Sequence, residues 1–355
     1  MSLDQPAGFA RRKFAPARHD GRQEATRATV PWEGPIFIVG MPRSGTKLLR
    51  GLLDQHPRIR ILPTETEFLP FLTSWVQKHG QPASEAAFER LYEALRGATY
   101  FNYRAAGRAP FDWRQWRAHC AAAYDVGGLF EGFVRYELGI PRGNGVIWAD
   151  KSPAYIRCVP LLLEHFRAAR VIHLVRDVRD YCVSSRRAWG KDVRRAAFRW
   201  GRDVLRAHRD CAADPRRCVE LKYEDLLQDP EGQMRRLSSF LGVDYHADLV
   251  DLQQSVERRG QAAGRAEIVQ DNFHKFEKYL TPREIAAVES LAWPAMTALG
   301  YRPKYARGPR ELGPMTEQVL RLKDGFQLLL KDARQRGVAG AIRFHTSHRK
   351  MTAKS

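Results

Sequence analysis

The sequence contains few cysteines, and their spacing matches neither a disulfide framework nor a zinc site. Five cysteines are spread over 355 residues, and no two of them form a CxxC pair. An odd count without paired spacing argues against both kinds of site. Because thiols stay reduced in the cytoplasm, we expect a cytoplasmic protein that needs no metal.

Long apolar runs are also missing. No run approaches the roughly 18 residues of a membrane-spanning helix. The basic residues near the N-terminus are not followed by the apolar segment of a signal peptide. We therefore expect residues 1–30 to form a flexible basic N-terminal arm.

Acidic residues are too few to balance the basic ones. The chain has 59 lysines and arginines against 40 aspartates and glutamates, which gives a formal net charge of +19. Such a charge favours an anionic partner: a nucleotide, an acidic polymer, a phospholipid surface or nucleic acid. Basic terminal segments in an arginine-rich composition would explain the charge without such a partner.

Short β-branched runs alternate with longer helical stretches from Pro35 onward. This pattern predicts an α/β fold with a central parallel sheet and flanking helices. We expect one domain over residues 31–305 and a basic, partly helical C-terminal extension over residues 306–355. The predicted strands are Ile36–Val39, Ile59–Leu62, Val146–Ala149, Arg170–Val175 and Val219–Leu221, and the predicted helices cover about 46–55, 65–79, 84–96, 112–138, 154–167, 178–188, 192–212, 230–241 and 283–299.

The C-terminal extension places apolar residues within a basic helical stretch. Such a helix could lie on a membrane, pair with another subunit or pack against its own domain. We favour packing against the domain or in a dimer.

The segment after the first predicted strand reads Gly40-Met41-Pro42-Arg43-Ser44-Gly45-Thr46-Lys47. A strand, a glycine-bounded loop and a helix form an anion cradle, because the loop N–H groups point inward beside the positive end of the helix. The nucleotide-binding P-loop reads G-x4-G-K-[ST], whereas here Thr46 precedes Lys47. The segment predicts anion binding by an altered P-loop; an ordinary strand–helix turn would leave its charged and hydroxyl residues unexplained.

The second and third predicted strands are followed by charged residues. Glu65 and Glu67 follow the second strand, and Lys151 follows the third. Side chains at the carboxyl ends of parallel strands face the ligand crevice. A carboxylate there could accept a proton from an attacking hydroxyl, and a lysine could neutralise a leaving group. The local alternatives are a capping box of Thr64 with Glu67 and a helix start capped by Ser152.

The fourth predicted strand ends at Val175 and is followed by Arg176-Asp177-Val178-Arg179-Asp180. Arg176 lies at the crevice end of the strand, and Ser184 follows eight residues later on the next predicted helix. Both could reach a second phosphate. Surface ion pairing is the alternative, but such pairs usually contribute less than about 1 kcal/mol.

Taken in this order, the segments resemble the sulfotransferase superfamily, whose members use 3′-phosphoadenosine 5′-phosphosulfate (PAPS). The resemblance covers roughly residues 35–300. It implies the P-loop-like three-layer architecture that sulfotransferases share with nucleotide kinases. In that family the G-x-P-R-S-G-T loop binds the 5′-phosphosulfate. The matching residues are Arg43, Ser44, Gly45, Thr46 and Lys47.

Other motifs of the family extend the predicted cofactor site. An arginine at a strand end and a serine eight residues later bind the 3′-phosphate, which matches Arg176 and Ser184. The family's Y-E-D-L segment implies that Tyr223 lies near the adenine pocket. The late loop that closes over the 3′-phosphate falls around Arg259–Arg265, which implies a role for Arg265 in cofactor binding.

The predicted catalytic residues follow from the same resemblance. Tyrosylprotein and heparan-type members carry a glutamate that can be laid over Glu65. The heparan-type segment E-K-[ST]-P-x-Y is similar to Asp150–Tyr155 and places Lys151 at the active-site lysine of those members.

The resemblance implies a transferase that moves a sulfuryl group from PAPS to a hydroxyl acceptor by in-line displacement. Glu65 takes the acceptor's proton, with Glu67 as the alternative base, while Lys151 or Lys47 stabilises the leaving oxygen. The acceptor could be a carbohydrate, a lipid, a peptide or a small molecule. Nucleic acid is not an expected partner; peripheral membrane contact and oligomer formation stay open.

Two other classes of protein would explain parts of the sequence. An ATP-dependent P-loop-like kinase needs the G-K-[ST] order and an acidic Mg²⁺ ligand after an apolar strand, but here Arg176 precedes Asp177. A basic membrane or nucleic-acid binding module would leave Glu65 and Lys151 without a role.

Overall fold

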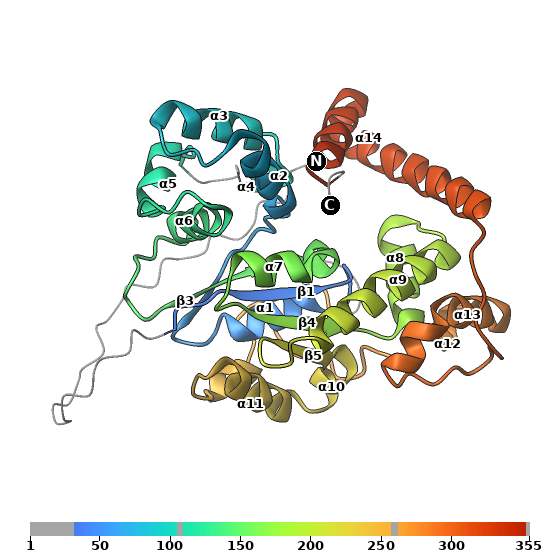
Figure 1. The fold of residues 1–355 in the computed structure, drawn as a ribbon. Coiled ribbons are helices and arrows are strands. Elements are labelled where there is room, and N and C mark those ends of the chain that lie inside the picture. The colour runs from blue at the N-terminus through green and yellow to red at the C-terminus, as the bar shows by residue number, and fades with distance from the viewer. Residues whose placement is uncertain (1–31, 105–108, 257–261, 353–355) are drawn as a thin grey trace.

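A parallel five-stranded sheet forms the centre of the structure (Figure 1). The computed structural model describes residues 32–104, 109–256 and 262–352, so the predicted arm at residues 1–30 lies outside the described part of the chain. The strand order is β2-β3-β1-β4-β5 and all neighbours run parallel, which confirms the predicted sheet. The strands are β1 (Ile36–Gly40), β2 (Ile59–Ile61), β3 (Ile147–Lys151), β4 (Arg170–Val175) and β5 (Cys218–Lys222).

Helices cover both faces of the sheet, which explains why its strands are nearly continuous apolar runs. Successive side chains of a strand point to opposite faces, so Ile36 and Ile38 enter one core while Phe37 and Val39 enter the other. The helices on the face of Ile36 and Ile38 are α1 (Thr46–Leu53), α10 (Tyr223–Gln228) and α11 (Pro230–Leu241).

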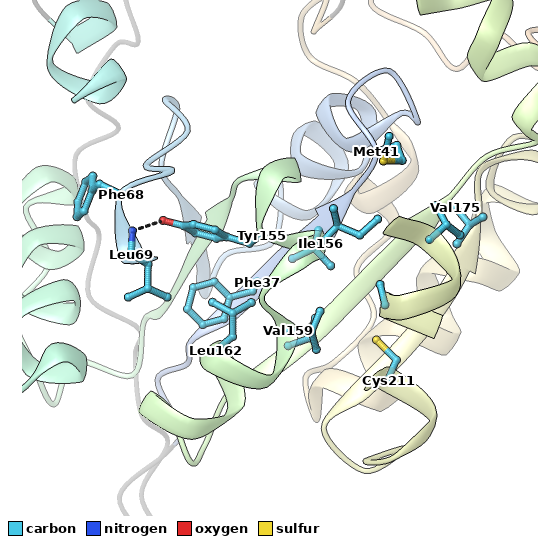
Figure 2. Close-up of a cluster of buried hydrophobic side chains, with 14 of the residues drawn as sticks. Phe37, Met41, Phe68, Leu69, Tyr155, Ile156, Val159, Leu162, Val175 and Cys211 are labelled. Atoms are coloured by element: carbon cyan, nitrogen blue, oxygen red, sulfur yellow. Dashed lines mark hydrogen bonds between the residues drawn. The ribbon is translucent and has the colours of Figure 1, made fainter. Parts of the chain in front are cut away.

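The larger core lies on the opposite face (Figure 2), where Tyr155, Val159 and Leu162 gather around Phe37. Its helices come from three parts of the chain: between β2 and β3, on either side of β4, and after β5. They are α2 (Leu69–His79), α3 (Glu85–Leu95), α4 (Thr99–Arg104), α5 (Trp113–His119), α6 (Val126–Leu138), α7 (Val159–His165), α8 (Val178–Trp189), α9 (Val193–Ala212), α12 (Phe276–Tyr279) and α13 (Pro282–Ala298). Two short 3-10 helices are η1 (Pro153–Arg157) and η2 (Ala247–Val250).

The single helix predicted over 112–138 is wrong, because the structure has two helices there. α5 ends at His119, and Ala121 and Ala122 adopt the left-handed region with φ of 50° and 63°. The Asp125 carboxylate then accepts the Gly128 N–H at 2.7 Å and begins α6. The apolar pattern is continuous across this break because both helices pack into the same core.

Two capping interactions considered as alternatives do not form. The capping box of Thr64 with Glu67 does not form: α2 begins at Leu69, and Glu67 has a left-handed φ of 55°. Ser152 precedes η1, but its hydroxyl makes no cap and instead accepts the Thr66 N–H at 2.9 Å. The local sequence suits capping in both places, but a contact between distant segments competes with it.

The C-terminal extension forms α14 (Pro314–Thr352), which is interrupted by Gly337 with φ of 72°. One face of α14 packs against the domain, as predicted. Leu320 is buried there, and Asp324 accepts the Asp192 N–H at 3.0 Å and pairs with Arg195 at 2.8 Å. Within the described ranges, no helix combines the length and apolarity needed to cross a membrane.

Candidate active site

The loop between β1 and α1 is the predicted anion cradle, and it turns the chain directly into the N-terminus of α1. Gly45 has a φ of 93° and precedes the first turn of α1, which begins at Thr46. A methyl group at Gly45 would lie 2.2 Å from the ring of Tyr223, so only glycine fits this position. The Ser44 side chain is fully buried, and its Oγ has no hydrogen-bond partner among the described residues. The cradle therefore holds an unsatisfied polar group beside the positive end of a helix.

Residues predicted for two phosphates converge beside this cradle. Arg43 Nε donates to Ser184 Oγ at 3.2 Å, and Arg176 Nη1 donates to the Arg43 carbonyl oxygen at 3.2 Å. The Arg176 guanidinium also lies 4.6 Å from the ring centre of Tyr223. Its Nε is buried without a hydrogen-bond partner in the described part of the chain. The structure thus brings together four side chains from three separate sequence segments: the β1–α1 loop, the β4–α8 segment and the start of α10.

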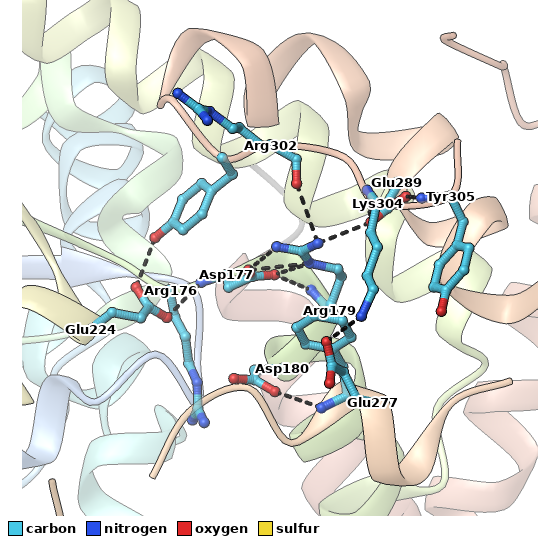
Figure 3. Close-up of polar contacts among 12 residues, drawn as sticks. Arg176, Asp177, Arg179, Asp180, Glu224, Glu277, Glu289, Arg302, Lys304 and Tyr305 are labelled. Atoms are coloured by element: carbon cyan, nitrogen blue, oxygen red, sulfur yellow. Dashed lines mark hydrogen bonds and ion pairs between the residues drawn. The ribbon is translucent and has the colours of Figure 1, made fainter. Parts of the chain in front are cut away.

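A buried ionic network fixes the backbone at Arg176 (Figure 3). Asp177 accepts from Arg179 at 2.6 Å, and Arg179 also donates to the fully buried Glu289 at 3.0 Å. Glu224 accepts the Asp177 N–H at 3.0 Å. These acids pair with Arg179 and the backbone, whereas Arg176 donates to the Arg43 carbonyl oxygen.

Two residues of this region were missed by sequence reasoning. The Asn272 carbonyl oxygen accepts from Arg176 Nη2 at 3.0 Å, and Asn272 Nδ2 donates to the Tyr223 hydroxyl at 2.8 Å. Lys275 Nζ donates to Asn272 Oδ1. Burial lowers the pKa of Lys275, and the positive charge of Arg176 acts in the same direction. Asn272 and Lys275 belong to no motif that the sequence could have revealed.

Arg265 lies farther out than the other predicted cofactor residues. Its guanidinium pairs with Glu267 at 3.4 Å, and 53% of the side chain is exposed. It does line the pocket beside Tyr223, whose other walls include Leu48 and Val269. Part of the predicted late loop, residues 257–261, lies outside the described residues.

Glu65 and Lys151 form an ion pair on the other side of the cradle. The predicted strand ended at Ala149, but β3 extends to Lys151, which pairs in register with Ile38 of β1. The Lys151 side chain is 2% exposed, whereas that of Glu65 is 35% exposed. A buried cation and a reachable carboxylate therefore lie next to the strand that leads into the cradle.

A hydrogen-bonded cluster holds Glu65 opposite Lys151. The Thr66 N–H donates to Ser152 Oγ at 2.9 Å, and the hydroxyls of Thr66 and Tyr155 are hydrogen-bonded at 2.7 Å. The Leu69 N–H donates to the Tyr155 hydroxyl at 3.1 Å, as Figure 2 shows. Thr66 and Ser152, which directly follow Glu65 and Lys151, are thus bonded to each other. This bond limits how far the two charged side chains can separate.

Two further acids near the pair have displaced pKa values. Burial raises the pKa of Glu67 to about 7, and the charge of Glu65 acts in the same direction. Burial likewise raises the pKa of Asp150 to about 7. Near neutral pH, each of these acids is close to its midpoint and carries a proton part of the time.

Comparison with known proteins gives a consistent result. A model described as "Sulfotransferase family" matches residues 35–247. An omega-hydroxy-beta-dihydromenaquinone-9 sulfotransferase from Mycobacterium tuberculosis is 34% identical over 268 residues, covering 64% of this chain and 67% of that protein. Protein-tyrosine sulfotransferase 1 from Danio rerio is 26% identical over 284 residues, covering 76% of this chain and 72% of that protein.

A solved structure has a similar fold. The sulfotransferase domain from the curacin biosynthetic pathway aligns with a TM-score of 0.52 and 18% sequence identity. The alignment covers 77% of this chain and 100% of that domain. The predicted architecture of a parallel sheet between helical layers agrees with this match.

Proposed function

We propose that this chain, which belongs to the sulfotransferase family and is a sulfuryl-transferring enzyme, takes the sulfuryl group from PAPS and passes it to a hydroxyl acceptor. One observation carries the choice of donor: Arg43, Arg176 and Ser184 meet beside the anion cradle. A donor with phosphates at both the 5′ and 3′ positions needs two adjoining anion sites. A simple nucleoside triphosphate needs one continuous site.

The residues present suit PAPS. The buried Ser44 Oγ and Arg176 Nε lack partners among the described residues, and buried polar atoms normally have one. The 43–47 loop would hold the 5′-phosphosulfate, and Arg176 with Ser184 would hold the 3′-phosphate. Several walls of the small pocket beside Tyr223 are apolar, and a flat base would have to widen this pocket to enter it.

Lys151 is placed to stabilise the leaving group. When bound, PAPS supplies the sulfuryl group and a 5′-phosphate oxygen that gains negative charge as the S–O bond breaks. Lys151 is almost fully buried, so its charge acts with little screening by water. The N–H groups of the cradle and Lys47 add positive potential at the same end of β1.

Glu65 is placed to accept the proton of the acceptor hydroxyl. Its carboxylate is partly exposed, and the ion pair with Lys151 fixes its position next to the cradle. A positioned base contributes on the order of 10²–10⁴ in rate. Glu67, with its pKa raised to about 7, is the alternative base.

Incubation with radiolabelled PAPS and a panel of acceptors tests the proposal. The panel contains a tyrosine peptide, a sugar, a lipid alcohol and a phenol, and label transfer is the readout. We expect transfer to at least one acceptor and none with Arg43→Ala. In parallel, adenosine 3′,5′-bisphosphate should raise the melting temperature, whereas ATP with Mg²⁺ should not. Protection by ATP with Mg²⁺ alone would support the kinase alternative.

A further inference from the structure

α14 has one face that is fixed to the domain. Leu320 and Asp324 are buried, Asp324 pairs with Arg195 at 2.8 Å, and Lys331 Nζ donates to the Ala188 carbonyl oxygen. These contacts recur at helical spacing, so they fix the rotation of the helix about its own axis. Figure 1 shows α14 running along the outside of the molecule rather than through it.

The fixed rotation turns a stripe of large apolar side chains toward solvent. Its members recur every three or four residues and are between 45% and 81% exposed. At 1.5 Å per residue the stripe is about 22 Å long. A run of this size on an ordered helix is unusual for a surface that meets only water. The stripe consists of Met315, Val319, Leu322, Phe326 and Leu330.

The charges around the stripe favour an anionic lipid surface over a second copy of α14 as its cover. Arg321 and Lys323 are exposed within the stripe's length, and Arg334 is exposed just beyond it. A second copy of α14 would bring the same positive charge against itself, which is unfavourable. An anionic lipid surface complements both the apolar stripe and the basic residues.

We propose that α14 docks this enzyme on an anionic lipid surface. The stripe enters the boundary between headgroups and acyl chains, and the basic residues contact lipid phosphates. This inference goes beyond the proposed function and holds whichever acceptor the enzyme uses.

Vesicle co-sedimentation of the full chain tests the proposal. One set of vesicles is phosphatidylcholine alone, and the other contains about a quarter phosphatidylglycerol. We expect the protein to pellet with the anionic vesicles at least tenfold more than with the neutral ones. Raising NaCl to about 0.5 M should release it, because exposed charges are then screened within a few ångströms. Equal binding to both vesicles, or binding to neither, would overturn the proposal.

Two matched double variants separate the stripe from general charge. Leu322→Asp with Phe326→Asp places two carboxylates in the stripe, and Thr316→Asp with Gln318→Asp places two on exposed polar positions of the same helix. We expect the first pair to lose binding at least tenfold and the second to retain most of it. Equal loss in both pairs would reject the stripe as the docking element. Light scattering tests the remaining alternative. If the wild-type protein is a dimer and the first pair of substitutions abolishes that dimer, a second copy of the chain covers the stripe instead of lipid.

Discussion

Arg43 Nε donates a hydrogen bond to Ser184 Oγ at 3.2 Å across 141 residues of sequence. Arg176 donates to the carbonyl oxygen of the same arginine at 3.2 Å. The two predicted phosphate sites therefore share Arg43 and form one structural unit. Because of this sharing, a change at one site should weaken binding at the other.

Lys275 is predicted to contribute more to nucleotide binding than Arg265. Lys275 lies beside Arg176, and its loss removes a charge close to the predicted 3′-phosphate site. Lys275→Ala should weaken binding of adenosine 3′,5′-bisphosphate by about 10- to 100-fold, the range for a charge-assisted hydrogen bond. Arg265→Ala is the matched control, with a loss of about threefold or less. Titration calorimetry measures both affinities. A larger loss in Arg265→Ala than in Lys275→Ala would show that Arg265 is the more important cation of the late loop.

The two candidate bases can be separated by amide substitutions of the same shape. Glu65→Gln should lower kcat by about 10²–10⁴-fold, because the amide that replaces the carboxylate beside Lys151 cannot accept a proton from the acceptor hydroxyl. Glu67→Gln should change kcat much less, and it should alter the kcat/KM profile near pH 7, where Asp150 continues to titrate. The melting-temperature rise caused by adenosine 3′,5′-bisphosphate should be kept in both. Glu65→Gln with wild-type kcat would identify Glu67 as the base.

Gly45→Ala is expected to damage the cradle. The new methyl group would lie 2.2 Å from the Tyr223 ring at a φ of 93°, so stability should fall by roughly 1–3 kcal/mol and nucleotide affinity should fall with it. Gly139→Ala is the control, since Gly139 has a φ of 66° and nothing within 4 Å of the added methyl. That variant should lose stability only. Unchanged nucleotide affinity in Gly45→Ala would contradict the predicted role of the cradle.

The buried Asp150 carboxyl should make stability depend on pH. Its pKa of about 7 in the folded state exceeds the ordinary value near 4, so the folded protein binds a proton that the unfolded chain releases. The stability from this group is greatest at low pH and is lost as the pH rises from about 4 to 7. Asp150→Asn should therefore raise the melting temperature more at pH 8 than at pH 5. Calorimetry at both values tests this, and an equal change would contradict it.

The fold and the convergence of Arg43, Arg176 and Ser184 could be predicted because their signals are local. The loop from Gly40 to Lys47 is contiguous, and Arg176 follows directly after a strand whose apolar run is unmistakable. Parallel strands bring such ends to one edge. This rule also placed Glu65 and Lys151 close together, and the structure pairs them.

The remainder depends on contacts between distant segments. Asn272 and Lys275 lie in an irregular segment and acquire their positions from Tyr223 and Arg176. The capping pattern at Thr64 is locally sound, but the Thr66 N–H is bonded to Ser152, 86 residues away. No periodicity or propensity encodes these partners.

The central position of β1 has a consequence for how such enzymes can diverge. The predicted donor residues come from the β1 loop and from the β4 and β5 side, whereas Glu65 and Lys151 stand at the two ends of one contiguous stretch that contains α2 to α6 and most of β3. Because most of β3 lies in that stretch and pairs with β1, the helices α2 to α6 can be exchanged between related enzymes only if β3 and its pairing with β1 are kept. With this layout, related proteins could keep the predicted donor residues while the helices beside Glu65 and Lys151 change.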